Sequence, residues 1–279
     1  MLKMQKYQGF GNDYLILNPK ENELKLEEKQ ISFLCRRNFG IGADGILYGP
    51  IEAGEKKYIR IFNSDGSEAC HSGNGVIIFA KYLKDTGNWK EKKGTLYTKA
   101  GKFEIEFLGE KEEKIRVCMG KPVFACDKIP VVGDTEEIVN EPLLFHGNLY
   151  NATCVSVGTP NCVIMMENVS GQKVRELGPY VENASYFPNQ ANLQLCHVKD
   201  EKHIELEIYE RGAGYTLSSG TGACAAVASA YRLGVCGKEV IVTMPGGELL
   251  IEIKSDFTMY LTGRAEKVGT FYVAEHFFV

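Results

Sequence analysis

The sequence predicts an α+β protein of two pseudo-symmetric domains, each a curled, mainly antiparallel sheet around a central helix. Three observations lead to this expectation: a repeated glycine-rich motif, a strand-like segment before each copy, and an apolar segment after each copy. The copies read Ser72-Gly73-Asn74-Gly75 and Ser219-Gly220-Thr221-Gly222, so they stand 147 residues apart (219 minus 72). Since this is close to half of the 279 residues, a duplicated domain is the natural explanation.

The segments in front of the two motifs have the pattern of strands. Residues 58–62 lead into the first motif, and residues 204–209 alternate apolar and polar side chains before the second. Further strands are expected at residues 95–107, 114–119, 239–243 and 249–253. A last strand near residues 270–278 is expected to return to the first domain.

The segments that follow the motifs are apolar nearly all round, unlike a surface helix with one apolar stripe. Each is therefore expected to be a helix buried within its own sheet. Lys121-Pro122 is the expected crossing between the halves. The first domain would comprise residues 1–121 with about 268–279, and the second would comprise residues 122–267.

Composition describes an ordinary globular chain, because 44% hydrophobic residues suffice for real cores. A net charge of -4 gives no expectation of a nucleic-acid partner. No stretch approaches the roughly 18 apolar residues of a membrane span, and no apolar signal core follows Met1. Nine cysteines without a Cys-x-x-Cys pair favour reduced thiols in a cytoplasm. No His/Cys cluster has ligand spacing, so no metal site is expected.

A glycine-rich turn that opens a buried helix presents unpaired N–H groups at the positive end of the helix dipole and suits an anion. The alternative is that the four motif glycines only permit tight turns. Two facing copies would clamp one carboxylate and would place a reactive group on each side of the neighbouring carbon. Inversion of a stereocentre needs two such acid/base groups. A Ser-His-Asp hydrolase is disfavoured, because no Gly-x-Ser-x-Gly elbow is present.

Ordered motifs from residue 9 to residue 247 resemble the diaminopimelate epimerase family. They read Gly9-Phe10-Gly11-Asn12-Asp13-Tyr14, Gly40-Ile41-Gly42-Ala43-Asp44-Gly45, Phe62-Asn63-Ser64-Asp65-Gly66-Ser67-Glu68-Ala69, Met119-Gly120-Lys121-Pro122, Phe187-Pro188-Asn189-Gln190-Ala191-Asn192, Tyr209-Glu210-Arg211-Gly212-Ala213-Gly214-Tyr215-Thr216 and Pro245-Gly246-Gly247. The resemblance implies two similar domains with the active site in the cleft between them. It also implies a pyridoxal-free, cofactor-independent isomerase that converts LL-diaminopimelate to the meso form for lysine and peptidoglycan precursors.

In the family, a thiol and thiolate pair transfers the proton, and its two cysteines correspond to Ser72 and Ser219 here. A serine hydroxyl is a far weaker acid than a thiol, and only His71 adjoins Ser72 as a conceivable base. We therefore expect the chain to be nearly inactive. Both deliberate replacement and natural loss would give this pattern, and two matched changes among intact motifs fit the first better.

The resemblance also implies a set of substrate contacts. Backbone N–H groups of the turns would hold the reacting carboxylate, Arg211 would grip a second carboxylate, and Glu210 would accept from a substrate ammonium. Ser72, Ser219 and Glu210 are thus the expected catalytic positions. The expected binding residues are Asn12, Asn63, Gly73, Asn74, Thr159, Asn192, Glu210, Arg211, Gly220 and Thr221.

Three departures from the family leave the substrate open. Ile77 stands where the family usually has arginine, and Gly158-Thr159-Pro160-Asn161 replaces the usual Gly-Asn-Pro-His. A racemase of another amino acid such as histidine is one alternative, and a non-catalytic amino-acid-binding protein is another. An isomerase with carboxylate bases is disfavoured, because no acidic residue replaces either cysteine. Related enzymes often pair as homodimers, so the expected partners are an amino-acid substrate and a second copy.

Overall fold

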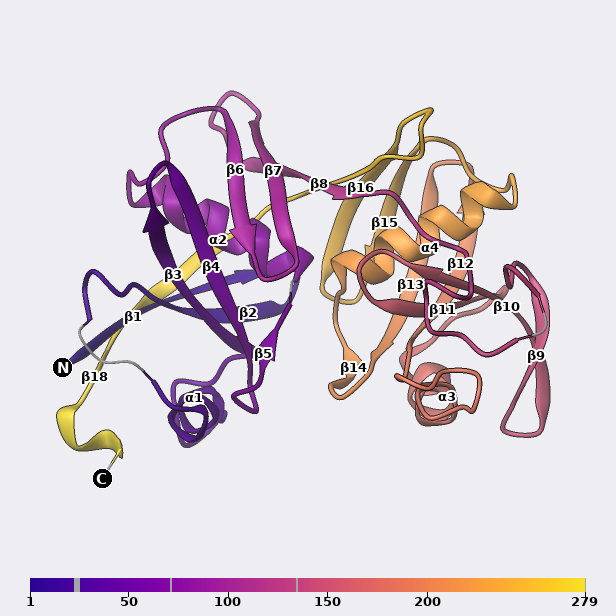
Figure 1. Cartoon of the computed structure of the whole chain (residues 1–279), viewed down its shortest axis with the longest axis horizontal. Coiled ribbons are helices and arrows are strands. Elements are labelled where there is room, and N and C mark those ends of the chain that lie inside the picture. The colour runs from indigo at the N-terminus through magenta and orange to yellow at the C-terminus, as the bar shows by residue number, and fades with distance from the viewer. Residues whose placement is uncertain (23–25, 71, 134, 279) are drawn as a thin grey trace. The chain divides into compact units, whose positions relative to one another are not determined.

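The computed structural model describes residues 1–22, 26–70, 72–133 and 135–278 (Figure 1). The chain forms two compact units, Met1–Val117 with Gly263–Val279 and Cys118–Thr262. The sequence-based boundaries lay at 121/122 and near 267/268. Each unit combines a mainly antiparallel sheet with helices, which confirms the α+β class.

Unit 1 holds one hydrogen-bonded series of strands around helix α2 (Gly73–Asp85), with α1 (Glu28–Cys35) outside it. β1 pairs antiparallel with β2 and β18, β3 with β4, and β6 with β7, whereas β2–β3 and β4–β6 are parallel. The strands are β1 (Leu2–Gly9), β2 (Asn12–Leu17), β3 (Gly45–Ala53), β4 (Lys56–Asn63), β5 (Glu68–Ala69), β6 (Lys93–Thr98), β7 (Gly101–Leu108), β8 (Lys114–Gly120) and β18 (Glu266–Val273), and a short 3₁₀ helix η1 (Glu275–Phe278) follows.

Unit 2 repeats this plan around helix α4 (Gly220–Arg232), with α3 (Gly171–Glu182) outside the sheet. α3 covers strands β12 and β13, and its apolar side chains join the core through Val174, Leu177 and Val181. The strands are β9 (Glu141–Phe145), β10 (Asn148–Ser156), β11 (Pro160–Met165), β12 (Asn192–Asp200), β13 (His203–Glu210), β14 (Gly214–Thr216), β15 (Glu239–Met244), β16 (Gly247–Ile253) and β17 (Met259–Gly263).

The internal repeat extends well beyond the glycine-rich motifs. Adding 147 to the bounds of β3, β4 and α2 gives 192–200, 203–210 and 220–232, which are the bounds of β12, β13 and α4. The offset therefore relates individual residues of the two units, such as Asn63 and Glu210 at the ends of β4 and β13. This confirms the pseudo-symmetric architecture.

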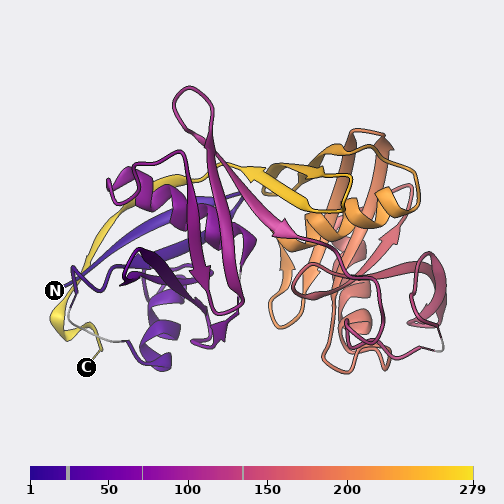
Figure 2. The same cartoon turned by 45° about the horizontal axis from the view of Figure 1, so that its top comes forward.

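Both central helices are buried on nearly all sides, as their apolar sequences predict. In Figures 1 and 2, α2 lies among the strands of unit 1 and α4 among those of unit 2. Residues 220–230 of α4 are all buried, and Cys224 is among them with its side chain in the core. α4 contacts strands β10 to β13, β15 and β16, whereas α2 contacts β1, β2 and β18 and keeps charged side chains only in its last turns, at Lys81, Lys84 and Asp85.

Two predicted strands differ in detail from the observed ones. Residues 95–107 form two antiparallel strands, β6 and β7, because the chain turns between Thr98 and Gly101, and Gly101 adopts a positive φ of 126°. The last strand, predicted near 270–278, spans residues 266–273 and ends before η1. It pairs antiparallel with β1 and so belongs to unit 1.

Candidate functional site

Ser72 is the N-cap of α2 and occupies the first glycine-rich turn. Its backbone is extended, with φ −149° and ψ 123°, and its Oγ accepts a hydrogen bond from the Gly75 N–H at 3.1 Å. The Oγ also accepts from the Tyr14 hydroxyl at 3.3 Å. Gly73 and Asn74, which follow the serine, are buried in the first helical turn. His71, the neighbour in sequence, lies outside the described residues.

Ser219 repeats this geometry at the start of α4. Its φ of −146° and ψ of 119° match those of Ser72 within a few degrees, and its Oγ accepts from the Gly222 N–H at 3.2 Å. The Thr221 hydroxyl lies 3.3 Å from the same Oγ. Gly220 and Thr221 are buried in the first turn. The duplicated sequence therefore yields two copies of one local structure, a serine-capped helix start.

The third glycine-rich position keeps space beside each serine. A Cβ at Gly75 would lie 3.1 Å from the Ser72 Cβ, and a Cβ at Gly222 would lie 3.2 Å from the Ser219 Cβ. Any side chain there would press on the capping residue. Close approach, rather than a positive φ, is what demands glycine at these two positions. Helix starts of this kind attract anions, because their first N–H groups have no partner within the helix.

In unit 2, hydrogen bonds connect three of the predicted ligand residues. The carboxamide oxygen of Asn192, at the start of β12, accepts from the Arg211 backbone N–H at 2.9 Å. Its nitrogen approaches the Thr159 hydroxyl at 3.5 Å and the Asn161 Oδ1 at 3.3 Å. One guanidinium nitrogen of Arg211 donates to the Asn189 carbonyl at 2.8 Å. The structure thus brings Thr159, Asn192 and Arg211 together.

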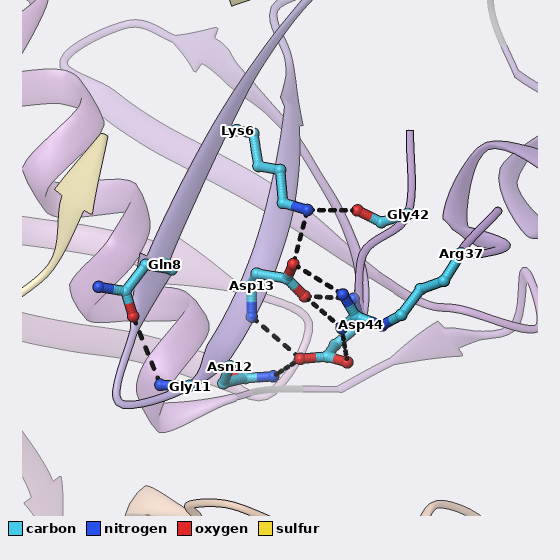
Figure 3. Close-up of polar contacts among 8 residues, drawn as sticks. All are labelled: Lys6, Gln8, Gly11, Asn12, Asp13, Arg37, Gly42 and Asp44. Carbon is cyan, nitrogen blue, oxygen red and sulfur yellow. Dashed lines mark hydrogen bonds and ion pairs between the residues drawn. The ribbon is translucent and has the colours of Figure 1, made fainter. Parts of the chain in front are cut away.

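In unit 1, Asn12 belongs to a network of charged groups at the start of β2 (Figure 3). Its Nδ2 donates to Asp44 Oδ2 at 2.9 Å, and the Asp13 backbone N–H donates to the same oxygen at 3.0 Å. The Asp13 carboxylate in turn accepts from both Arg37 terminal nitrogens, at 3.1 and 2.7 Å, and from Lys6 Nζ at 2.7 Å. Because Asn12 Nδ2 donates to Asp44, the carboxamide oxygen of Asn12 points away from Asp44.

The network shifts the pKa of both of its strongest partners. Burial by itself raises the pKa of the Asp13 carboxyl, but the hydrogen bonds and charges of Arg37 and Lys6 outweigh burial and hold it below its usual range. The hydrogen bonds that Arg37 donates to Asp13 raise the pKa of Arg37 in return. Both groups are therefore charged at neutral pH.

Asn63 and Glu210 end the strands that lead into the two turns. The Asn63 Nδ2 donates to the Ser67 hydroxyl at 3.0 Å, and no hydrogen bond between Asn63 and Asn12 is recorded among the described residues. Glu210 is half-buried at the end of β13. Ile77, which departs from the family pattern, is fully buried in α2. Asn161 is almost fully buried, and its Nδ2 donates to the Thr159 carbonyl at 2.6 Å.

Sequence reasoning missed three residues beside the predicted ones. Tyr14 donates a hydrogen bond to Ser72, and Asp44 accepts one from Asn12. Both residues belong to motifs quoted above, but no role was predicted for either of them. Gln194 is fully buried, and neither polar atom of its side chain has a hydrogen-bond partner among the described residues. Its Nε2 lies against Gly222, 2.8 Å from where a Cβ would stand. The offset of 147 residues relates Gln194 to Leu47, which packs beside Gly75 in the first turn. The repeat is therefore the sequence signal that relates Gln194 to the second turn.

All nine cysteines are free thiols, and Cys70 is the exposed one that lies nearest in sequence to Ser72. Within the described ranges, no group of three or more His, Cys, Asp or Glu side chains could hold a metal ion. No helix in the part of the chain that the structure describes is long and apolar enough to span a membrane.

The chain matches the family model described as diaminopimelate epimerase over residues 4–125 and 153–268. It is 41% identical over 269 residues to a protein of Nostoc sp. named diaminopimelate epimerase 2, with 96% of this chain and 94% of the relative covered. It is 35% identical over 272 residues to the diaminopimelate epimerase of Leptospira biflexa, covering 96% and 97%.

Solved structures with the same fold are more distant in sequence. A hydroxyproline epimerase from Agrobacterium vitis, with trans-4-hydroxy-L-proline bound, has a TM-score of 0.72 at 12% identity and covers 100% of this chain and 92% of its own. A phenazine biosynthesis protein of the PhzF family from Bacillus anthracis has a TM-score of 0.68 at 15% identity, with 98% and 99% covered. At these identities the likenesses show that the fold is shared.

Proposed function

Because the chain belongs to the diaminopimelate epimerase family, a family of isomerases, we propose that it is built to interconvert LL- and meso-diaminopimelate without a cofactor. One group at position 72 and one at position 219 would exchange a proton with opposite faces of the same α-carbon. The observation that carries the proposal is the pair of helix starts, in which two N-cap residues adopt nearly the same φ and ψ.

In this proposal the two turns hold the carboxylate next to the reacting carbon. Negative charge develops on that carboxylate as the α-proton leaves, and N–H groups at helix starts stabilise such charge. The buried first turns, Gly73 to Gly75 and Gly220 to Gly222, exclude water from those groups. Exclusion of water strengthens the interaction, since electrostatic attraction grows as the local dielectric constant falls.

A second cluster would select a substrate with two carboxylates. Arginine has five N–H donors, and Arg211 commits one guanidinium nitrogen to the Asn189 carbonyl, so its fork retains donors for a carboxylate. Asn192 orients the backbone of Arg211 and lies beside Thr159. Glu210 precedes Arg211 and would accept from the ammonium of the distal amino acid. A monocarboxylic substrate would leave Arg211 without its partner.

We also propose that the chain with serine at both positions transfers protons very slowly. A thiolate can form near neutral pH at a helix N-terminus, whereas a serine hydroxyl has no comparable ionised form there. Each serine oxygen lies 3.3 Å from its hydroxyl neighbour, longer than the roughly 2.7–2.8 Å usual between hydroxyls. That separation leaves room for the larger sulfur atom at both positions.

The test restores both thiols and follows the loss of the substrate α-proton signal by NMR in deuterated water. The Ser72→Cys, Ser219→Cys double variant is compared with the unmodified chain on LL-diaminopimelate, meso-diaminopimelate, lanthionine, histidine, glutamate and alanine. We expect exchange on the diaminopimelates at a rate at least about a hundredfold above that of the unmodified chain, since each positioned acid/base group contributes about that much.

Two other results would change the assignment. Exchange on histidine or another amino acid would move the substrate and give Ile77, Thr159 and Asn161 a role in specificity. No exchange on any compound, with diaminopimelate still bound in a calorimetric titration, would favour a non-catalytic amino-acid-binding protein. The serines at both base positions, beside the retained Asn192, Glu210 and Arg211, are the observation that favours this second function.

A further inference from the structure

The phenol of Tyr14 contacts the capping residue of one half of the site. Tyr14 is buried on β2, and its hydroxyl donates to Ser72 Oγ at 3.3 Å. Its neighbour on the parallel strand β3 is Gly45. A Cβ at Gly45 would lie 2.8 Å from Cε1 of the tyrosine ring, so the ring occupies the space that this glycine leaves. The ring is therefore held in place from the strand side while its hydroxyl reaches Ser72.

The other half of the site offers no such phenol at the equivalent place. The repeat offset of 147 relates Tyr14 to Asn161. The side chain of Asn161 is committed elsewhere, because its Nδ2 donates to the Thr159 carbonyl and its Oδ1 accepts from Asn192. The hydroxyl beside Ser219 comes instead from Thr221, on the same turn. The backbone of the two turns is repeated, whereas the donor next to the capping oxygen is not.

The elements around Ser72 supply few other charges. The first turn of α2 carries no charged side chain, and the packed neighbours on β3 are Gly45 and Leu47. Asp44, which precedes Gly45, is paired with Arg37 at 2.9 Å. Asp13 points to the opposite face of β2 from Tyr14, because successive side chains of a strand alternate, and it is neutralised by Lys6 and Arg37. Cys70, two residues before Ser72, is exposed.

We propose that Tyr14 is a positioning residue for the acid/base group at position 72 and makes the two halves of the site unequal. A phenol hydroxyl is a stronger hydrogen-bond donor than the aliphatic hydroxyl of a threonine. With cysteine at position 72, the phenol would stabilise the thiolate and fix the direction of its lone pairs. The group at 72 would then rest as the base, and the group at 219 as the acid. This inference rests on the proposed function.

The test measures the acidity of the thiol itself, so that it does not depend on turnover. A Cys70→Ser, Ser72→Cys variant is alkylated with iodoacetamide across a range of pH around the thiol reference value of about 8.5. Peptide mass spectrometry follows the tryptic peptide between Arg60 and Lys81, in which position 72 is then the single thiol. The same measurement is made with Tyr14→Phe added, which keeps the ring and removes the hydroxyl.

We expect Tyr14→Phe to raise the pKa of the thiol at position 72 by roughly one unit, a tenfold loss of thiolate at lower pH, as for one hydrogen bond to a charged group. The matched control is Ser219→Cys, whose pKa Tyr14→Phe should leave unchanged, with tandem mass spectra separating it from buried Cys224. Circular dichroism and the melting temperature confirm the fold of each variant. An unchanged pKa at position 72, or an equal rise at both positions, overturns the inference.

A second readout separates this inference from the proposed function. Tyr14→Phe in the double-cysteine variant should slow diaminopimelate exchange and move the acidic limb of its pH profile upward by the same amount as the thiol pKa. If the double-cysteine variant exchanges nothing, the proposed function fails, while the alkylation result still decides the role of Tyr14.

Discussion

Replacing Asp13 by asparagine should destabilise unit 1 by about 3 kcal/mol. Its carboxylate accepts from Arg37 twice, from Lys6 once and from the Asp44 N–H at 3.1 Å. Whichever oxygen becomes the amide nitrogen, two of these donors face another donor. Charge-assisted hydrogen bonds contribute about 1.5–3 kcal/mol each. The contribution of Arg37 to this free energy is small, because its side chain is 58% exposed and would be solvated by water after the substitution. The contribution of Lys6 is larger, because its side chain is 14% exposed. Removal of one partner from a buried ion pair costs about 3–5 kcal/mol.

Glu68→Gln is the matched control. Glu68 also pairs with one arginine through both carboxylate oxygens, at 2.9 and 3.2 Å from Arg60. This pair is more exposed, with 25% of the Glu68 side chain and 40% of the Arg60 side chain accessible. Exposed pairs contribute about 0–1 kcal/mol. Urea unfolding of both variants by circular dichroism, with the slope of the transition compared to exclude a change of cooperativity, measures the difference.

The cost of Asp13→Asn should depend on pH in one direction. The folded pKa of Asp13 lies below its unfolded value of about 3.9. Its stabilisation is therefore complete above that value and is lost as the pH falls through the folded pKa. The two proteins should converge in stability in acid and differ most near neutral pH. A loss below about 1 kcal/mol at neutral pH, or a gap that widens in acid, would refute a stabilising role for the ion pairs.

Three further predictions concern the frame of the site. Ser170→Ala removes the N-cap of α3 and should cost about 1 kcal/mol in urea unfolding, because the Ser170 oxygen accepts from the N–H three residues on. Gly40→Ala should cost about 2 kcal/mol or more, since its Cβ would lie 2.3 Å from a backbone oxygen, whereas Gly269→Ala, with its nearest contact at 3.5 Å, should not destabilise. Iodoacetamide should modify exposed Cys70 and spare buried Cys196, as measured by mass spectrometry, because burial raises the pKa of the Cys196 thiol to about 12. Since this pKa lies above the unfolded value of about 8.5, the contribution of Cys196 to stability should be complete below about pH 8.5 and decline toward pH 12.

The internal repeat made most of the fold predictable from sequence. Two copies of a serine followed by glycines, each before an apolar segment, predicted the central helices, and both begin at the residue after the serine. The hairpin at Gly101 was missed because residues 95–107 have a continuous strand pattern and a single glycine gives a weak turn signal. Propensity and periodicity describe neighbours along the chain, and they are most reliable where one element is long and apolar.

The contacts of the candidate site were less predictable, because they join strands that are far apart in the sequence. Asp44 reaches Asn12 across 32 residues, and Tyr14 reaches Ser72 across 58. Both residues lie inside recognisable motifs, yet no spacing rule states which side chain faces which. Pairing of β2 with β3, and the packing of α2 on β2, bring them together. Such contacts follow from the register of the sheet, which the sequence alone did not define.

Duplication gives one chain two similar helix starts, which in the proposed function would bind a ligand whose two ends differ. The turns keep the same backbone in both units, and in the proposed function both would supply N–H groups to the same carboxylate. The strands beside them have diverged. At equivalent positions, Asn63 corresponds to Glu210, and Tyr14 corresponds to Asn161. A neutral amide in unit 1 thus corresponds to a carboxylate in unit 2, and a phenol in unit 1 corresponds to an amide in unit 2. Inversion of one stereocentre requires an acid on one side and a base on the other, so the two groups must differ in protonation state. In this chain the difference between the units lies in the strand residues, whereas the two turns are alike.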